Sequence, residues 1–147
     1  MKYLIILTLL SCSRAKHSPA VIDPAFAPYI KTFNDYGGPK VNVNVIFADL
    51  APYNTAAVGM CFLNEINESS SVIKIDINYW PTLGQYGKEE TILHELGHCV
   101  LGLYHDTTLI YLPPFVNVPK SIMYPSIFGD YLYYVYNRDY YIKEMIK

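Results

Sequence analysis

Two histidines four residues apart, His94 and His98, enclose a glutamate, Glu95, in the run HELGH. On an α-helix, side chains four residues apart lie about 40° apart around the axis, so both imidazoles face one side. Both can therefore reach one zinc ion at about 2.0–2.1 Å. Glu95 is then placed to take a proton from water at the metal and to pass it to a leaving amine. The pattern predicts a hydrolytic zinc site.

The alternative interpretation is a fortuitous match to this short pattern, expected in roughly a few chains per thousand from average composition. Three of the four histidines of this chain fall within the twelve residues 94–105. The surrounding segment is also predicted to be a helix from its own pattern. Both observations favour zinc binding.

His105 is the candidate third ligand. If the helix simply continued, His105 would lie about 16 Å along the axis from His94, too far to share one ion. The chain must therefore turn back, and Gly102 can adopt the left-handed conformation that ends helices. Asp106 is an alternative ligand, because carboxylates also bind zinc. A histidine on a solvated loop is the other interpretation of His105.

These residues resemble the metzincin motif, HExxHxxGxxH followed by a methionine turn. The run SIMYP at residues 121–125 is similar to that turn in the form seen in matrixins. The resemblance implies that Met123 forms an apolar floor beneath the metal. It also implies one catalytic zinc ion, three histidine ligands and a glutamate base, namely His94, His98, His105 and Glu95.

The spacing departs from the metzincin pattern by one residue. Metzincins place glycine three residues after the second histidine, whereas Gly102 comes four residues after His98, and His105 is shifted equally. A slight helical overhang or a local bulge would absorb the extra residue. Asp106 remains an alternative because some metzincin relatives use aspartate there.

Over the wider chain the resemblance is to small matrixin-like lipoproteins of Gram-negative bacteria. It implies that a peptide substrate lies along residues 72–77, as an edge strand that supplies backbone hydrogen bonds. The aspartates are too scattered to assign a calcium site.

The elements that must position these residues follow from the hydrophobic pattern. A helix is expected to start near Ala27-Pro28 and to end before Gly37, because proline is tolerated only in a first turn. Alternating apolar residues predict three strands, separated by turns and by a polar loop at 64–71. The strands are expected at Val41–Phe47, Ala57–Phe62 and Val72–Ile77.

The zinc-binding helix is expected over Lys88–Leu101, with Glu89 and Glu90 in its first turn, where negative charge suits the helix dipole. The following 104–126 segment holds four prolines and is expected to be a long ordered loop. Asp139 is expected to cap a short final helix.

Together, pattern and resemblance predict an α+β, zincin or metzincin-like domain. A small twisted mixed sheet packs on the N-terminal helix and on the zinc-binding helix. The methionine turn and a C-terminal helix follow.

The N-terminus is similar to a bacterial export signal. Lys2 precedes an apolar run at residues 3–10, which is too short to span a bilayer. The run ends in LLSC, which resembles a lipobox, so Cys12 is expected to carry the lipid. We expect a signal peptide at 1–11, a lipid-anchored tether at 12–22 and one metallopeptidase domain at 23–147.

An exported lipoprotein of the bacterial envelope, at the outer membrane, is therefore expected. An ordinary secretory signal with an incidental cysteine is the alternative, and the protein would then be secreted. With Cys12 assigned to lipid, Cys61 and Cys99 remain, and an even number of cysteines in an oxidising compartment favours a disulfide between them. Two buried free thiols are the alternative. Zinc ligation by Cys99 is disfavoured, because it lies about 100° from His98 around the helix.

Composition limits the partners. The 147 residues fit one domain, and 52% hydrophobic against 16% charged residues argue against a disordered chain. A net charge of −2 without a basic run makes nucleic acid an unexpected partner. We expect a monomer that binds peptides or proteins. The 15 tyrosines are interpreted mainly as core residues with a polar tip. The alternative is that they form an adhesive surface near the cleft.

The predicted function is a zinc-dependent metalloendopeptidase that hydrolyses peptide bonds outside the cytoplasm through a zinc-activated water, with Glu95 as base. The alternative is a non-catalytic binding or adhesion lipoprotein with a structural zinc site. Such a site is usually closed by a fourth protein ligand and has no need of a base. An effector that acts on one host or prey protein would use the same peptidase chemistry.

Overall fold

The computed structural model describes residues 19–53, 56–63 and 71–147. The predicted signal peptide, Cys12 and most of the predicted tether and polar loop lie outside these residues. Within them, no helix is long and apolar enough to cross a bilayer.

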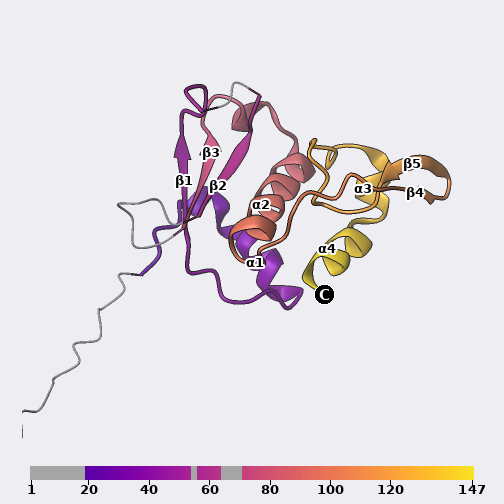
Figure 1. Cartoon of the computed structure of the whole chain (residues 1–147), viewed down its shortest axis with the longest axis horizontal. Helices are drawn as coiled ribbons and strands as arrows, with labels where there is room; N and C mark the ends of the chain where they lie inside the picture. Colours follow the sequence, from indigo (N-terminus) through magenta and orange to yellow (C-terminus); the bar gives the residue numbers. More distant parts are fainter. Residues whose placement is uncertain (1–18, 54–55, 64–70) are drawn as a thin grey trace, which may run out of the picture.

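Three strands form a mixed sheet (Figure 1) in the order β1-β3-β2. Strand β1 (Asn44–Ala48) pairs parallel with β3 (Val72–Asp76), and β2 (Gly59–Phe62) pairs antiparallel with β3. The prediction of a small mixed sheet is therefore confirmed.

The expectation that the third strand is an edge strand is wrong. Strand β3 is central, and its residues are buried except for the partly exposed Lys74. A strand with a neighbour on each side has no free backbone edge to offer a peptide. Strand β2 is an edge strand and contacts helix α2 (Gln85–Cys99), which carries His94 and His98.

The end of the predicted tether packs against the sheet. Ile22 forms a parallel bridge with Val45 of β1, and the Val45 amide donates to the Val21 carbonyl at 2.9 Å. The ordered domain therefore begins before residue 23, where its start was predicted.

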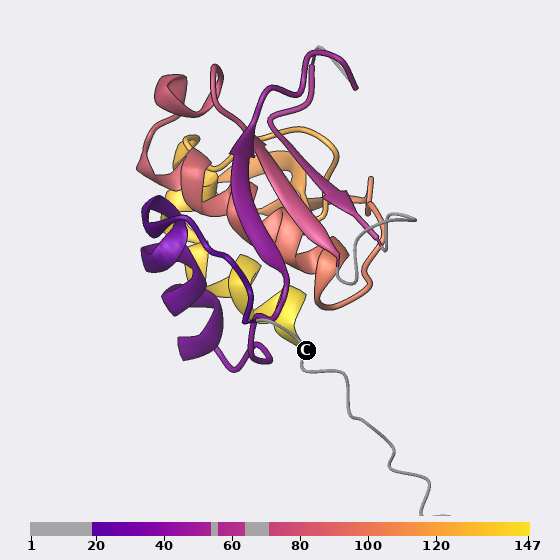
Figure 2. The ribbon, with the colours of Figure 1, turned by 90° about the vertical axis from the view of Figure 1, so that its left-hand side faces the viewer.

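Helices α1 (Ala27–Asp35) and α2 lie together on one side of the sheet (Figure 2). Both were predicted, and the α+β class is confirmed. Asp23 caps the 3-10 turn (Pro24–Phe26) that leads into α1. The side chains fully buried between helices and sheet are Phe26, Phe33, Val45, Ile73, Ile75, Ile92, Leu93 and Leu96.

Helix α2 begins one turn earlier than predicted, so the expectation that Glu89 and Glu90 occupy its first turn is wrong. Asp130 occupies that end of the helix instead. Its two carboxylate oxygens accept the amide hydrogens of Gly84 and Gly87, each at 2.8 Å. This negative charge at the helix N-terminus comes from more than 40 residues away in the sequence, where no local pattern could indicate it.

The expected long loop contains a two-stranded hairpin, β4 (Leu109–Leu112) and β5 (Phe115–Pro119). The two strands meet at a cis Pro113-Pro114 turn. The hairpin lies at the side of the molecule away from the main sheet (Figure 1). The prediction of an irregular loop is wrong here, because strands this short, punctuated by prolines, carry too little periodicity to detect.

The C-terminal segment forms α3 (Leu132–Tyr136) and α4 (Arg138–Ile146). Asp139 does not cap the final helix, because Asn137 holds the N-cap position and Asp139 lies inside α4. Its carboxylate accepts a hydrogen bond from the Tyr36 hydroxyl of α1. Tyr134 and Tyr141 are fully buried, whereas Tyr131 and Tyr136 are exposed, so the interpretation as core residues holds for only part of the C-terminal tyrosines.

A disulfide joins Cys61 of β2 to Cys99 at the end of α2. The predicted pairing is confirmed, and Cys99 is therefore not free to bind a metal. The bond fixes the edge strand against the helix that carries the histidines.

Replacing both cysteines by serine is expected to lower the free energy of unfolding by about 4 kcal/mol, because the cross-link closes a 38-residue loop in the unfolded chain. Urea denaturation with and without reductant measures this change. Reductant should shift the wild type towards the double variant and leave the double variant unchanged. Equal stability of the oxidised wild type and the double variant would contradict the expectation.

Candidate metal centre

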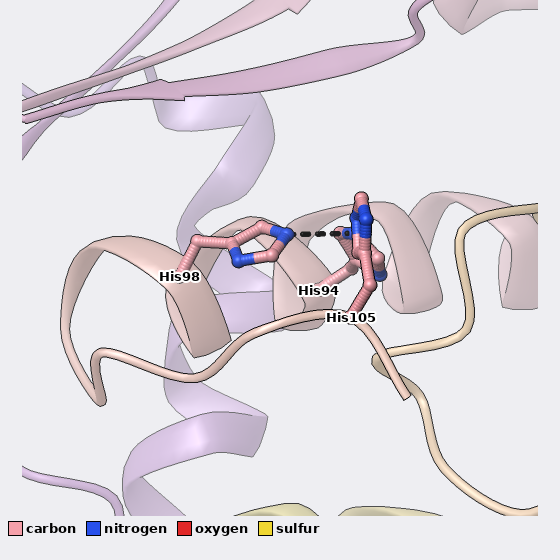
Figure 3. Close-up of side chains that lie close together, drawn as sticks. All are labelled: His94, His98 and His105. Atoms are coloured by element: carbon pink, nitrogen blue, oxygen red, sulfur yellow. Dashed lines mark hydrogen bonds between the residues drawn. The ribbon is translucent and has the colours of Figure 1, made fainter. Parts of the chain in front are cut away.

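Three histidine side chains converge at the surface of α2 (Figure 3). His94 and His98 come from consecutive turns of the helix, and His105 comes from the segment that returns along it. The Nε2 atom of His94 lies 3.1 Å from Nε2 of His98 and 3.2 Å from Nε2 of His105. Three nitrogens bound to one tetrahedral zinc ion at about 2.0–2.1 Å would lie about 3.4 Å apart. The separations therefore fit a shared zinc ion.

Hydrogen bonds from the Nδ1 atoms fix the ring orientations of His94 and His98. Nδ1 of His94 donates to the Ile122 carbonyl at 2.8 Å, and Nδ1 of His98 donates to the Leu103 carbonyl at 2.7 Å. With the hydrogen held on Nδ1, each Nε2 turns its lone pair towards the cluster, as in zinc-binding histidines. The two carbonyl partners were not predicted, because a backbone acceptor leaves no mark in the sequence.

Burial keeps these two imidazoles neutral, the form that binds metal. Desolvation lowers the pKa of His94 to about 4 and also lowers the pKa of His98. His105 is exposed, whereas the other two rings are half-buried. The histidine cluster is therefore partly buried where it lies on helix α2 and exposed to solvent at His105.

Gly102 returns the chain as predicted, with a left-handed φ of 68°. Helix α2 ends at Cys99, and the Leu103 amide donates back to the Gly97 carbonyl at 2.9 Å. The extra residue relative to the metzincin spacing therefore falls in the turn after the helix, and no bulge is needed within α2.

Asp106 lies outside the cluster. Its carboxylate accepts hydrogen bonds from the Thr108 amide at 2.9 Å and from Lys120 at 3.3 Å. Of the two candidates for the third ligand, the structure brings His105 to the other histidines.

Met123 lies beneath α2 and is 2% exposed. It packs so closely on Gly97 that a Cβ there would come within 2.4 Å of the Met123 sulfur. The same segment holds both parts of the cluster, because the Ile122 carbonyl bonds to His94 and the Met123 carbonyl accepts the Asp106 amide at 2.9 Å. This close packing explains the glycine at position 97, and an apolar floor formed by Met123 beneath the metal stays a prediction.

Glu95 points from α2 towards strand β2. The side chain is 5% exposed, and its Oε2 atom is buried without a hydrogen-bond partner among the described residues. Burial raises the pKa of Glu95 to about 8, and the Cys61 backbone amide partly offsets this. Burial therefore increases the proton affinity of this carboxyl group.

Gly59 of β2 makes room for this carboxylate, because a Cβ at this position would lie 2.8 Å from Cγ of Glu95. The close approach of Gly59 to Glu95 was not predictable from the sequence, because it joins two segments that are distant in the chain. A cavity of about 860 Å³ runs between β2, α2 and residues 124–127. Its lining includes all three histidines, both Glu90 and Glu95, and Tyr104.

Glu90 is a second buried acid on α2 and is 1% exposed. Its Oε2 atom accepts the amide hydrogens of Phe128, at 2.8 Å, and Gly129. Desolvation raises the pKa of Glu90 from 4.5 to about 8 despite these two hydrogen bonds.

This shift predicts a pH-dependent stability. Because the folded state raises the pKa, the contribution of Glu90 is fully present below pH 4.5 and is lost as the pH rises through 8. Relative to the Glu90→Gln variant, the metal-free wild type is expected to lose at most about 4 kcal/mol of unfolding free energy between pH 5 and pH 9. Urea denaturation of both proteins at the two pH values measures the difference. Parallel pH profiles would contradict it.

Comparisons with known protein families, curated proteins and solved structures find no match to this chain.

Proposed function

We propose that this protein is a zinc metalloendopeptidase with a metzincin-like arrangement of its active site. The observation that carries the proposal is the convergence of three histidine Nε2 atoms beside a buried glutamate on one cavity. The ring geometry, the neutral imidazoles and the carbonyl partners of His94 and His98 all fit a zinc ion.

The roles of the side chains follow from their positions. His94, His98 and His105 hold the ion through Nε2. When bound, zinc supplies Lewis acidity that polarises a carbonyl and acidifies a water molecule. Glu95 accepts the proton of the attacking water and returns it to the leaving amine, a role supported by its place in the cavity lining beside the three histidines.

Strand β2 is the proposed docking edge for the substrate, in place of residues 72–77. It lines the cavity at residues 59–61 and, within the part of the chain that the structure describes, pairs with another strand of the sheet only on its β3 side. An extended peptide can add to such an edge through backbone hydrogen bonds, while side-chain pockets select the sequence.

A structural zinc site in a binding lipoprotein is the competing function. It would need a fourth protein ligand, and among the described residues only three side chains form the cluster. Cys99, the nearest candidate in sequence, is held in the disulfide. A three-ligand site that leaves one position for water favours the peptidase.

The test uses protein loaded with one equivalent of zinc and denatured casein as substrate. We expect cleavage that a chelator abolishes and that added zinc restores. Stoichiometric zinc without cleavage would favour the structural site. Failure to bind zinc at all would remove both functions.

Export, the lipid anchor at Cys12, an envelope location and a monomeric state remain proposals drawn from the sequence. Mass spectrometry of the protein from a bacterial envelope tests the anchor. A Cys12→Ala variant is expected to lack the lipid adduct and to leave the membrane fraction.

A further inference from the structure

Glu90 occupies the same face of α2 as His94, one turn nearer the N-terminus of the helix, or about 6 Å along the axis. Both residues line the cavity of the candidate site. The metal chemistry described above does not use Glu90. A buried acid in a cavity wall needs a partner, because an unpaired charge is costly to bury.

The two carboxylate oxygens of Glu90 differ in their surroundings. Oε2 accepts two backbone amides, from Phe128 and Gly129. For Oε1 no hydrogen bond is seen among the described residues, and Glu90, although only 1% exposed, belongs to the lining of the cavity. One oxygen is therefore held by the fold, and the other remains able to accept a donor that enters the cavity.

The cavity offers no cation to meet this oxygen. Among the described lining residues there is no lysine or arginine. The acid Asp130 adds a negative charge that raises the pKa of Glu90 further. The lining of the same cavity includes the aromatic and apolar side chains of Tyr79, Tyr124 and Ile127. Such walls suit the aliphatic stem of a long basic side chain, whose charged head seeks a polar end.

We propose that Glu90 makes the site selective for peptides that carry a lysine or arginine side chain. The stem of that side chain lies in the cavity beside His94, and its cationic head donates to Oε1 of Glu90. This inference rests on the proposed peptidase function, because it treats the cavity as a substrate pocket. The competing role is purely structural, with Glu90 only holding the turn at residues 128–129.

Peptide binding can be measured without cleavage, in zinc-loaded protein carrying Glu95→Gln. The probes are otherwise identical labelled peptides in which each position in turn is lysine or norleucine, with arginine and citrulline as a second pair. Fluorescence anisotropy at pH 9, above the pKa of about 8 of the Glu90 carboxyl, gives the dissociation constants. At one position the cationic peptide is expected to bind at least about tenfold more tightly, as for a hydrogen bond to a charged group.

Adding Glu90→Gln to this protein should bring the ratio close to one, because the amide keeps the shape and an acceptor for the two backbone amides but loses the charge. Glu90→Asp, which keeps the charge on a shorter arm, should give an intermediate ratio. Asp35→Asn is the matched control. It removes one negative charge from the exposed Lys31–Asp35 pair on α1, and the ratio should not change. Unfolding midpoints at pH 5 verify the fold of each variant.

If the cationic and neutral peptides bind with equal dissociation constants at every position, the inference is overturned, even if the wild type cleaves casein. This result needs no variant at Glu90. A preference that survives Glu90→Gln in a folded protein would overturn it as well. A Glu90-dependent preference for cationic peptides in a wild-type protein that cleaves no substrate would support the inference and contradict the peptidase proposal. Absence of any peptide binding would overturn both.

Discussion

Replacing Glu95 by glutamine is expected to slow peptide hydrolysis by about 10²–10⁴-fold, the usual contribution of a general acid–base group. The amide occupies the same space but cannot take up a proton. Zinc should stay bound with one equivalent per chain, because Glu95 is not one of the three side chains of the cluster. The measurements are kcat/KM on a fluorogenic peptide and the zinc content of the purified variant.

Glu144→Gln is the matched control for this variant, since it makes the same chemical change on α4, outside the cavity lining. It should hydrolyse the peptide at the wild-type rate. Undiminished proteolysis by the Glu95→Gln variant would show that another group serves as base. Loss of zinc from it would show that the carboxylate is a ligand.

Replacing His105 by alanine is expected to weaken zinc binding by at least about 100-fold, because even partners of metal ligands contribute about 10–100-fold. Only two Nε2 atoms, from His94 and His98, would remain at the site. Peptide hydrolysis should fall with zinc occupancy. A competition titration against a chromophoric chelator measures the affinity.

Asp106→Asn separates the two candidates for the third ligand. Asp106 pairs with Thr108 and Lys120 away from the cluster, so its amide variant should bind zinc as the wild type does. If Asp106→Asn weakened binding and His105→Ala did not, the aspartate would be the ligand.

The part of the candidate site that the sequence predicts is the part governed by local helix geometry. His94 and His98 face one side because of the helical repeat. His105 returns to them because Gly102 takes a left-handed conformation. The disulfide was predictable from the number of cysteines left for pairing.

The rest depends on contacts between distant segments. The alternating pattern of residues 72–77 predicts a strand, but not that it lies between two others. Glu89 and Glu90 suit a helix N-terminus by type, yet Glu89 pairs with Arg138 of α4 at 2.6 Å and Glu90 holds the turn at 128–129. Their partners come 38 to 49 residues later in the chain, beyond the reach of periodicity or capping rules.

If the protein is the proposed peptidase, the disulfide between Cys61 and Cys99 restricts how a substrate enters the cavity. The disulfide joins strand β2 to the end of helix α2. These two walls of the cavity therefore cannot move apart by a hinge motion. Under the proposed peptidase function, we expect a polypeptide substrate to bind in an extended conformation. We therefore expect compact native proteins to resist attack until they loosen, while loosely structured chains are cut readily.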